Sequence, residues 1–364
     1  MKSRNHAVTA KTRGMYGSLL TREDYGQLAQ AGSVGGVAEY LGKQTVYGET
    51  LSGADLNKLN RAALEYRLED HLTGAYAKLR AFTSGPENRF LCAMARKFEI
   101  ERLLAVMRGV AAGGNVSAGE NASSGGNASS GGSAPKNADR PAGDHTAPDF
   151  GELAGAGSLA ELSESLSGSV YGNLTGRHLK ASPVNFTAVE SALYSYYYGE
   201  LCRRHFPGLE KKAADEIRDV TGMQADLINL ELIARVKRYF PQDPPDPSNI
   251  LPYIIPVSSR VSAEEMRELV DAKDAEGLAR RLEETYYAKS LPFSSFGNIS
   301  DYANHFLYGH YRRLYRNPEP DFRVAFGYLN LLEIEKRNLT RLIESVRYGL
   351  PGGEILRNII GYDA

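Results

Sequence analysis

Three acidic residues stand at equivalent places on predicted helices, where carboxylates could either transfer protons or tie helices together. Residues 324–347 carry apolar side chains at helical spacing, and Glu335 falls within that apolar stripe, seven residues after Tyr328 and seven before Leu342. A carboxylate inside an apolar stripe needs a hydrogen-bonding partner. The sequence therefore predicts an amphipathic helix with an acid that a neighbouring element must satisfy.

The same arrangement occurs on two further predicted helices, in residues 97–108 and 226–235. In each of the three, a polar residue follows the acid by three positions, and a leucine follows that residue. The acids and their followers are Glu335 with Asn338, Glu99 with Arg102, and Asp226 with Asn229. A pattern found on three helices of one chain indicates an internal repeat.

Two interpretations of the acids are possible. As catalytic groups, Glu99, Asp226 and Glu335 would be acids or bases with raised pKa values. As structural groups, each would bond to an arginine or tyrosine on a neighbouring helix of its own domain and fix the register of that helix. Because the acids occupy equivalent places in separate domains, we expect them to lie far apart. This expectation favours the structural interpretation for the acids and for Asn229 and Asn338.

Other patterns of catalytic or ligand-binding residues are missing from the sequence. Gly36 and Gly42 resemble a phosphate-binding loop, but five residues separate them where four are needed, and Gln44 stands where Ser or Thr should bind magnesium. The seven histidines form no HExxH motif and no cluster with the two cysteines. We therefore predict no catalytic residue, no cofactor and no metal site.

The charge balance argues against nucleic acid as a partner. The 364 residues include 43 Lys and Arg against 44 Asp and Glu, a formal net charge of −1. The tyrosine-rich run 194–198 could stack on bases, but no basic patch accompanies it, and tyrosines more often cover a core or a protein interface. No run approaches the roughly 18 apolar residues of a membrane span. We expect a cytoplasmic protein without its own membrane anchor.

A second repeat consists of small residues around short helices. Residues 24–33 match residues 149–158, the tripeptide 46–48 matches 170–172, and a weaker copy covers residues 265–287. We call residues 24–47, 149–171 and 265–287 the short-helix segments. A longer, tyrosine-rich helix is predicted after each of them, over 56–82, 186–206 and 299–315.

The repeats predict an all-α chain of three homologous helical domains, with boundaries at 1–88, 89–209 and 210–364. We expect the N-terminus to supply the first helix of the first domain and the Glu335 helix to close the series. A period longer than about 100 residues is too long for a solenoid, whose repeats run to about 50 residues. Residues 113–148 contain a tandem Asn-Ala-Ser-Ser-Gly-Gly and almost no branched aliphatic side chains, which predicts a disordered insertion in the second domain.

Motifs along nearly the whole chain resemble those of the C subunit of prokaryotic V-type (A/V-type) ATPases, whose eukaryotic counterpart is the d subunit. They are Leu19-Leu20 before Asp24-Tyr25 and Leu28, Leu41 with Thr45-x-Tyr47, Gly327-Tyr-Leu, Glu335-x-x-Asn338-Leu339, and Gly349-Leu-Pro351 with Glu354-Ile355. The insertion, Asp226 in place of Glu and Arg102 in place of Asn depart from the family pattern.

The resemblance implies a funnel of three similar helical domains around a pseudo-threefold axis. Its narrow side would sit on the cytoplasmic rim of the membrane rotor ring, and its cavity would take the end of the stalk made by the D and F subunits. The protein would then be a non-catalytic coupling piece of a membrane complex, serving proton or sodium transport driven by ATP, or ATP synthesis.

The short-helix segments are our candidates for contact with a partner. The residues singled out are Asp24, Tyr25, Tyr47, Asp149, Phe150, Tyr171, Thr285 and Tyr287. Two other classes of protein stay open. A helical scaffold unconnected with a rotary ATPase would show the same repeats, and a helical hydrolase would need a pocket that brings two of the acids together. The sequence leaves the transported ion, the direction of the reaction and the role of the insertion open.

Overall fold

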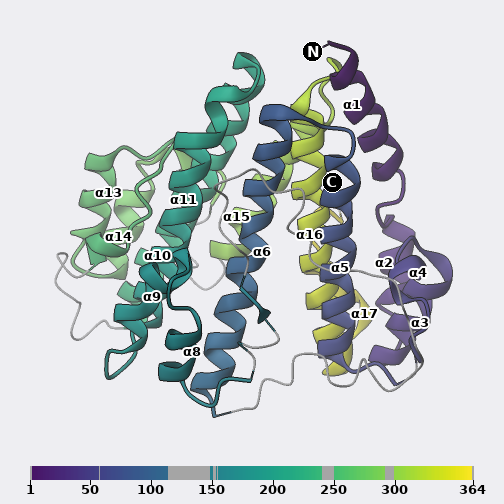
Figure 1. Cartoon of the computed structure of the whole chain (residues 1–364), viewed down its shortest axis with the longest axis horizontal. Helices are drawn as coiled ribbons and strands as arrows, with labels where there is room; N and C mark the ends of the chain where they lie inside the picture. Colours follow the sequence, from purple (N-terminus) through teal and green to yellow (C-terminus); the bar gives the residue numbers. More distant parts are fainter. Residues whose placement is uncertain are drawn as a thin grey trace. The chain divides into compact units, whose positions relative to one another are not determined.

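The computed structural model describes residues 2–56, 58–113, 148–150, 153, 155–239, 250–291 and 299–362 (Figure 1). Within these residues the chain forms helices, turns and irregular segments and contains no strand. The prediction of an all-α fold is therefore confirmed for the described part of the chain. The predicted disordered insertion lies outside the described residues, except at its ends.

The chain divides into two compact units, and the first of them contains both ends of the chain. Met1–Ser84 and Tyr308–Ala364 belong to the first unit, and the described residues from Gly85 to Leu307 belong to the second. The predicted domains 1–88, 89–209 and 210–364 follow the sequence repeats and not these units. That division, and the threefold arrangement of the domains, stay predictions.

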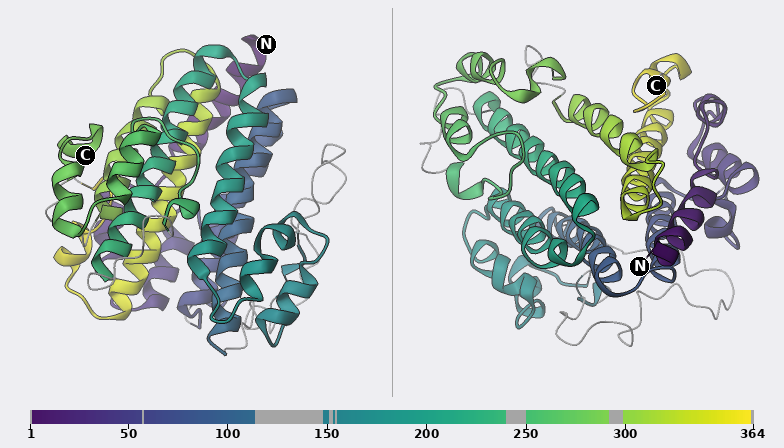
Figure 2. Two further views of the ribbon diagram at one scale, coloured as in Figure 1. Left: turned by 90° about the vertical axis from the view of Figure 1, so that its left-hand side faces the viewer. Right: turned by 90° about the horizontal axis from the view of Figure 1, so that it is seen from above.

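Helix α16 is the central element of the first unit. It packs against α1, α3, α5 and α17 (Figures 1 and 2). The helices of this unit are α1 (Lys2–Tyr16), α2 (Arg22–Leu28), α3 (Val34–Gln44), α4 (Gly48–Leu51), α5 (Arg61–Arg80), the end of α15 (Ile299–Tyr315), α16 (Phe322–Arg347) and α17 (Gly352–Arg357). The predicted helix 324–347 is thereby confirmed. Its first half, residues 322–332, is buried on every face, and only its second half has the expected exposed stripe.

One apolar core joins the N-terminal short helices to the C-terminal helices. Leu28 on α2 and Leu41 on α3 are fully buried in it together with Leu342 on α16, and Ile355 on α17 is 1% exposed. The start of α2 is fixed by its N-cap Thr21, whose hydroxyl accepts from the N–H of Asp24 while the Asp24 carboxylate accepts from the N–H of Thr21. The cap and the core together hold the short helices on α16.

The second unit contains two long helices that each hold a pair of short ones. Helix α8 packs on α6 and against α9, and α14 packs on α11 and against α13 (Figure 2). The helices are α6 (Gly85–Ala111), α8 (Leu159–Ser165), α9 (Val170–Leu179), α10 (Phe186–Glu200), α11 (Lys211–Tyr239), α13 (Ala263–Val270), α14 (Ala275–Leu282) and the start of α15. A π turn at Leu201–His205 extends α10, and 3₁₀ turns lie at Phe206–Gly208, Leu251–Tyr253 and Tyr286–Lys289.

Candidate functional site

The carboxylate of Glu335 holds together two N-terminal segments and the C-terminal helix α16. One of its oxygens, Oε2, accepts a hydrogen bond from the N–H of Leu20 at 2.7 Å, and the other, Oε1, accepts one from the hydroxyl of Tyr47 at 2.8 Å. Glu335 is 5% exposed and Tyr47 is 1% exposed. Two donors therefore replace water around a buried acid, as a buried carboxylate requires.

The surroundings of Glu335 place its titration near neutral pH. Burial raises the pKa of Glu335 to about 7, although the hydrogen bonds from Leu20 and Tyr47 favour the charged form. Burial and the nearby charge of Glu335 raise the pKa of Tyr47 well above its ordinary value. The proton between the two groups therefore belongs to Tyr47, and Glu335 is the group that titrates.

Asn338, one turn after Glu335, fastens the C-terminal residues to α16. Its amide donates to the carbonyl of Ile360 at 2.9 Å, and its carbonyl oxygen accepts from the N–H of Ile360 at 2.9 Å. The amide also lies 3.4 Å from the hydroxyl of Tyr25, a long hydrogen bond. Because Asn338 is 2% exposed, these contacts satisfy a side chain that water does not reach.

The second unit repeats this arrangement at Asp226 on α11. Its Oδ2 accepts from the hydroxyl of Tyr287 at 2.9 Å and from the N–H groups of Ser259 at 3.1 Å and Arg260 at 2.8 Å. Asp226 is fully buried, and burial raises its pKa while these donors oppose the rise. Its follower Asn229 bonds the backbone of Ile255 through both ends of its amide. This is the arrangement that Asn338 makes with Ile360.

The third copy, at Glu99 on α6, is more open. Glu99 Oε2 accepts from the hydroxyl of Tyr171 at 2.8 Å, and the Glu99 side chain is partly exposed while Tyr171 is 2% exposed. Burial, followed by the charge of Glu99, raises the pKa of Tyr171. Arg102 occupies the place of the asparagine, and its guanidinium lies 4.9 Å from the ring centroid of Phe150. At this copy, the contact between the Arg102 guanidinium and the Phe150 ring stands in place of the backbone hydrogen bonds that Asn338 and Asn229 make.

Each long helix thus carries an acid that accepts a hydrogen bond from the last residue of a short-helix segment. A hydroxyl residue stands two positions before each tyrosine, a spacing that the sequence analysis noted only as Thr45-x-Tyr47 and did not extend to the other two copies. Each of these hydroxyls donates to a carbonyl three or four residues before it, and the donors are Thr45, Ser169 and Thr285. The spacing hydroxyl-x-Tyr was the signal that could have aligned all three copies.

The residues predicted to contact a partner occupy two kinds of place. Tyr25, Tyr47, Tyr171 and Tyr287 are each at most 7% exposed, and Thr285 is 9% exposed. These side chains lie in the core of their units and do not offer a contact surface. Of the others, Asp149 is exposed, Phe150 lies under Arg102, and Asp24 caps α2. That the short-helix segments contact a partner stays a prediction.

The three acids do not share a site among the described residues. Each has its own tyrosine, and no hydrogen bond joins one acid to another within the described part of the chain. The described residues contain no group of three or more His, Cys, Asp or Glu side chains placed to hold a metal ion. Among the same residues, no helix has both the length and the apolar character needed to cross a membrane.

Comparison with known proteins identifies one family. The family model described as ATP synthase (C/AC39) subunit matches residues 8–358. The match therefore includes all three acids, their tyrosines, and both Asn229 and Asn338. A search among curated proteins found no match.

Proposed function

Because the chain belongs to the C/AC39 family of ATP synthase subunits, we propose that it is a non-catalytic part of the central stalk of a rotary V-type ATPase. In this role it couples the D/F stalk of the ATP-hydrolysing head to the rotor ring of the membrane sector. It would lie on the cytoplasmic side and attach to the membrane only through the complex. The complex would transport protons or sodium ions at the expense of ATP, or make ATP from their return.

The observation that carries the proposal is the family match over residues 8–358, nearly the whole chain. The geometry of the acids supports the non-catalytic part. The donors to Glu335 and Asp226 come from the backbone and from buried tyrosines of the same unit, so these carboxylates hold helices in register. Densely packed interiors are stiff and transmit strain, which suits a protein that passes torque.

Deletion of the gene tests the coupling role. In membrane vesicles from the deletion strain, we expect ATP hydrolysis by the detached head to persist and ATP-driven ion uptake to be lost. Re-expression of the chain should restore uptake and re-couple it to hydrolysis. Ion uptake that continues without this protein would contradict the proposal.

Isolation of the tagged native protein tests its partners. We expect the D and F stalk subunits and the protein of the rotor ring to co-purify with it at fixed proportions. Recovery of the chain with neither stalk nor ring proteins would indicate a helical scaffold that is unconnected with a rotary ATPase.

A further inference from the structure

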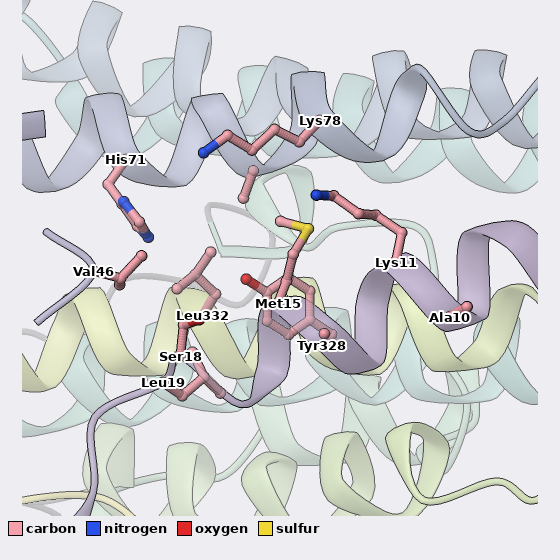
Figure 3. A pocket seen from close by; sticks show the side chains of 12 residues that line it. Ala10, Lys11, Met15, Ser18, Leu19, Val46, His71, Lys78, Tyr328 and Leu332 are labelled. Atoms are coloured by element: carbon pink, nitrogen blue, oxygen red, sulfur yellow. The ribbon is translucent and has the colours of Figure 1, made fainter. Parts of the chain in front are cut away.

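A pocket in the first unit lies where α1, α5 and α16 meet, and the proposed coupling role does not use it. Its volume is about 330 Å³, within the range of small-ligand sites. The residues that matter for its chemistry are Lys11 and Met15 from α1, His71 and Lys78 from α5, and Tyr328 and Leu332 from α16 (Figure 3). All of them belong to one compact unit.

Tyr328 is a buried residue whose hydroxyl faces this pocket (Figure 3). The residue is 2% exposed, and no described residue donates or accepts a hydrogen bond at its hydroxyl, whereas the equally buried Tyr47 bonds Glu335. The residue also lines the pocket, so this hydroxyl is accessible from it. Burial and the charge of Glu335 raise the pKa of Tyr328, so its hydroxyl keeps its proton. The hydroxyl is therefore a donor that a ligand could satisfy.

The charges around the pocket favour a ligand with a single negative charge. The ammonium groups of Lys11 and Lys78 extend toward it from two helices (Figure 3). Lys78 Nζ lies 3.0 Å from the Glu49 carboxylate, which compensates one of the two positive charges. Burial, with Lys78 nearby, lowers the pKa of His71 to about 4, so its ring is neutral at pH 7. Among the side chains that line the pocket, one positive charge remains uncompensated, and Glu335, whose charge acts on Tyr328, does not line it.

The walls beside these groups are apolar. Met15, Leu332 and the ring of Tyr328 line the pocket between the polar groups (Figure 3). We propose that the pocket binds a small organic monoanion, a carboxylate on a short apolar body. The carboxylate accepts the Tyr328 hydrogen bond and lies near Lys11, and the apolar body lies along Met15 and Leu332. A bare inorganic phosphate would leave these apolar walls without a contact.

Binding would connect α1 to the two helices beneath it. Among the described residues, the polar contacts of α1 include a 3.4 Å hydrogen bond from Thr9 to the carbonyl of Asp321 and one from Arg13 to the carbonyl of Asn317 at 3.2 Å. A ligand that binds only the folded state raises its stability by mass action. Bound ligand should therefore slow amide exchange in α1 more than in α13 or α14.

Titration calorimetry on the full chain tests the proposal with butanoate, hexanoate and octanoate as probes. We expect affinity to increase with chain length until the pocket is filled. The neutral octanamide should bind at least about tenfold more weakly than octanoate, because it lacks the charge that the uncompensated ammonium attracts. Inorganic phosphate should not compete with the bound acid.

Three variants locate the site. Tyr328→Phe keeps the ring and should weaken octanoate binding about fivefold to tenfold, the worth of one hydrogen bond. Lys11→Gln should weaken it about tenfold at low salt and less at high salt. Lys43→Gln is the matched control, because Lys43 is an exposed lysine of the same unit that pairs with Glu39 on α3. It should leave binding unchanged.

Several results would overturn the proposal. They are the absence of binding by all three acids, equal affinity for octanamide, displacement of the acids by phosphate, or unchanged affinity in both Tyr328→Phe and Lys11→Gln. A thermal melt of each variant separates lost binding from lost folding. Should Tyr328→Phe unfold, Lys11→Gln and the exchange rates of α1 still decide the outcome.

Discussion

At the scale of single residues, Glu335 and Tyr47 depend on each other. The Tyr47 hydroxyl is one of two donors to a carboxylate that is 5% exposed, and the other is the backbone of Leu20. Removing one partner of a buried charged hydrogen bond leaves the remaining charge poorly solvated. The two side chains therefore contribute as a unit and not as separate contacts.

Replacement of the tyrosine measures this dependence. We expect Tyr47→Phe to lower the free energy of unfolding by about 1.5 to 3 kcal/mol, the range for hydrogen bonds to charged groups. Tyr328→Phe removes a hydroxyl that bonds no described residue from a tyrosine of similar overall burial, so it should leave the free energy of unfolding nearly unchanged. Chemical denaturation of both variants gives the comparison. Equal losses of unfolding free energy in the two variants would show that the hydrogen bond from Tyr47 to Glu335 does not stabilise the fold.

The raised pKa of Glu335 predicts how stability changes with pH. The folded pKa is about 7 and the ordinary value is 4.5, so between these pH values the unfolded chain loses a proton that the folded chain keeps. The folded state then binds more protons, and the free energy of unfolding falls as pH rises through this window. Over the full window the contribution of Glu335 is on the order of 3 kcal/mol.

The variant Glu335→Gln removes this titration. Relative to the variant, the native chain should lose stability between pH 5 and pH 8, as measured by denaturant unfolding at each pH. Glu354→Gln, on the exposed surface of α17, is the control and should follow the native pH profile. A native-minus-variant difference that stays constant across this range would show that Glu335 does not titrate there.

The sequence predicted which residues carry the acids but could not predict their partners. The apolar stripe and the repeat were sufficient to select Glu335, Glu99 and Asp226. Each acid bonds a tyrosine that lies 288, 72 or 61 positions away in the sequence. Spacing within one helix carries no information about such contacts. For the same reason the tyrosines were predicted to meet a partner, although their hydroxyls are used inside the fold.

At the scale of elements, Gly327 shows why one motif needs a glycine. A Cβ atom there would lie 2.6 Å from the backbone N of Tyr315 and 2.7 Å from the carbonyl of Tyr311, so α16 and α15 approach each other through their backbones. Because the contacting atoms belong to the backbone, rotation of a side chain cannot relieve the contact. The motif Gly327-Tyr-Leu, which the sequence analysis gave as a family resemblance, is therefore a site of close helix packing.

A pair of alanine substitutions tests this packing. Gly327→Ala should destabilise the chain by about 1 to 3 kcal/mol, because two backbones must move apart. Gly309→Ala, on α15, meets no atom within 4 Å and should stabilise by about 0.5 to 1 kcal/mol through helix propensity. The melting temperatures of the two variants should therefore change in opposite directions. Changes in the same direction would contradict close packing at Gly327.

The hydrogen bonds between Asn338 and Ile360 predict that loss of the asparagine side chain destabilises the end of the chain first. Asn338→Ala removes both hydrogen bonds to Ile360 and should cost about 1 to 3 kcal/mol. Hydrogen exchange should become faster at Ile360 and in α17 before it changes in α6 or α11. Asn317→Ala, whose side chain bonds Glu319 and Asp321 in the turn before α16 and does not contact Ile360, serves as the control. Unchanged exchange at Ile360 would show that the hydrogen bonds from Asn338 do not hold this segment in place.

Helix positions could be predicted from the sequence, whereas the pairing of helices in space could not. The predicted helices 299–315 and 324–347 correspond to α15 and α16, because uninterrupted apolar spacing determines them locally. The sequence did not reveal the π turn after α10, and it placed the Glu335 helix at the end of a series. In the structure the acid of α16 bonds Tyr47, so this helix supplies to the first short-helix segment what α6 and α11 supply to theirs. The order of repeats along the chain does not show which copies pair in space.

At the scale of the whole molecule, the first unit exists only if the two ends of the chain meet. Leu28 and Leu41 from the N-terminal part share one core with Leu339, Leu342 and Ile343 from α16. Short helices of four to eleven residues have little stability alone, because nucleation is costly and packing supplies most helical stability. The N-terminal helices therefore depend on residues more than 280 positions later.

Truncation of the chain after Asp321 tests this dependence, because it removes α16 and α17 and leaves the second unit complete. We expect α2, α3 and α4 to lose protection from hydrogen exchange, while α8, α9, α13 and α14 keep theirs. A chain that ends at Ile360 is the control, since Glu335 and Asn338 keep their partners. If the long truncation aggregates, Leu342→Ala should weaken the same core by about 2 to 5 kcal/mol. Its effect on exchange should again be confined to the first unit, and protected α2–α4 helices in either chain would show that the N-terminal part folds by itself.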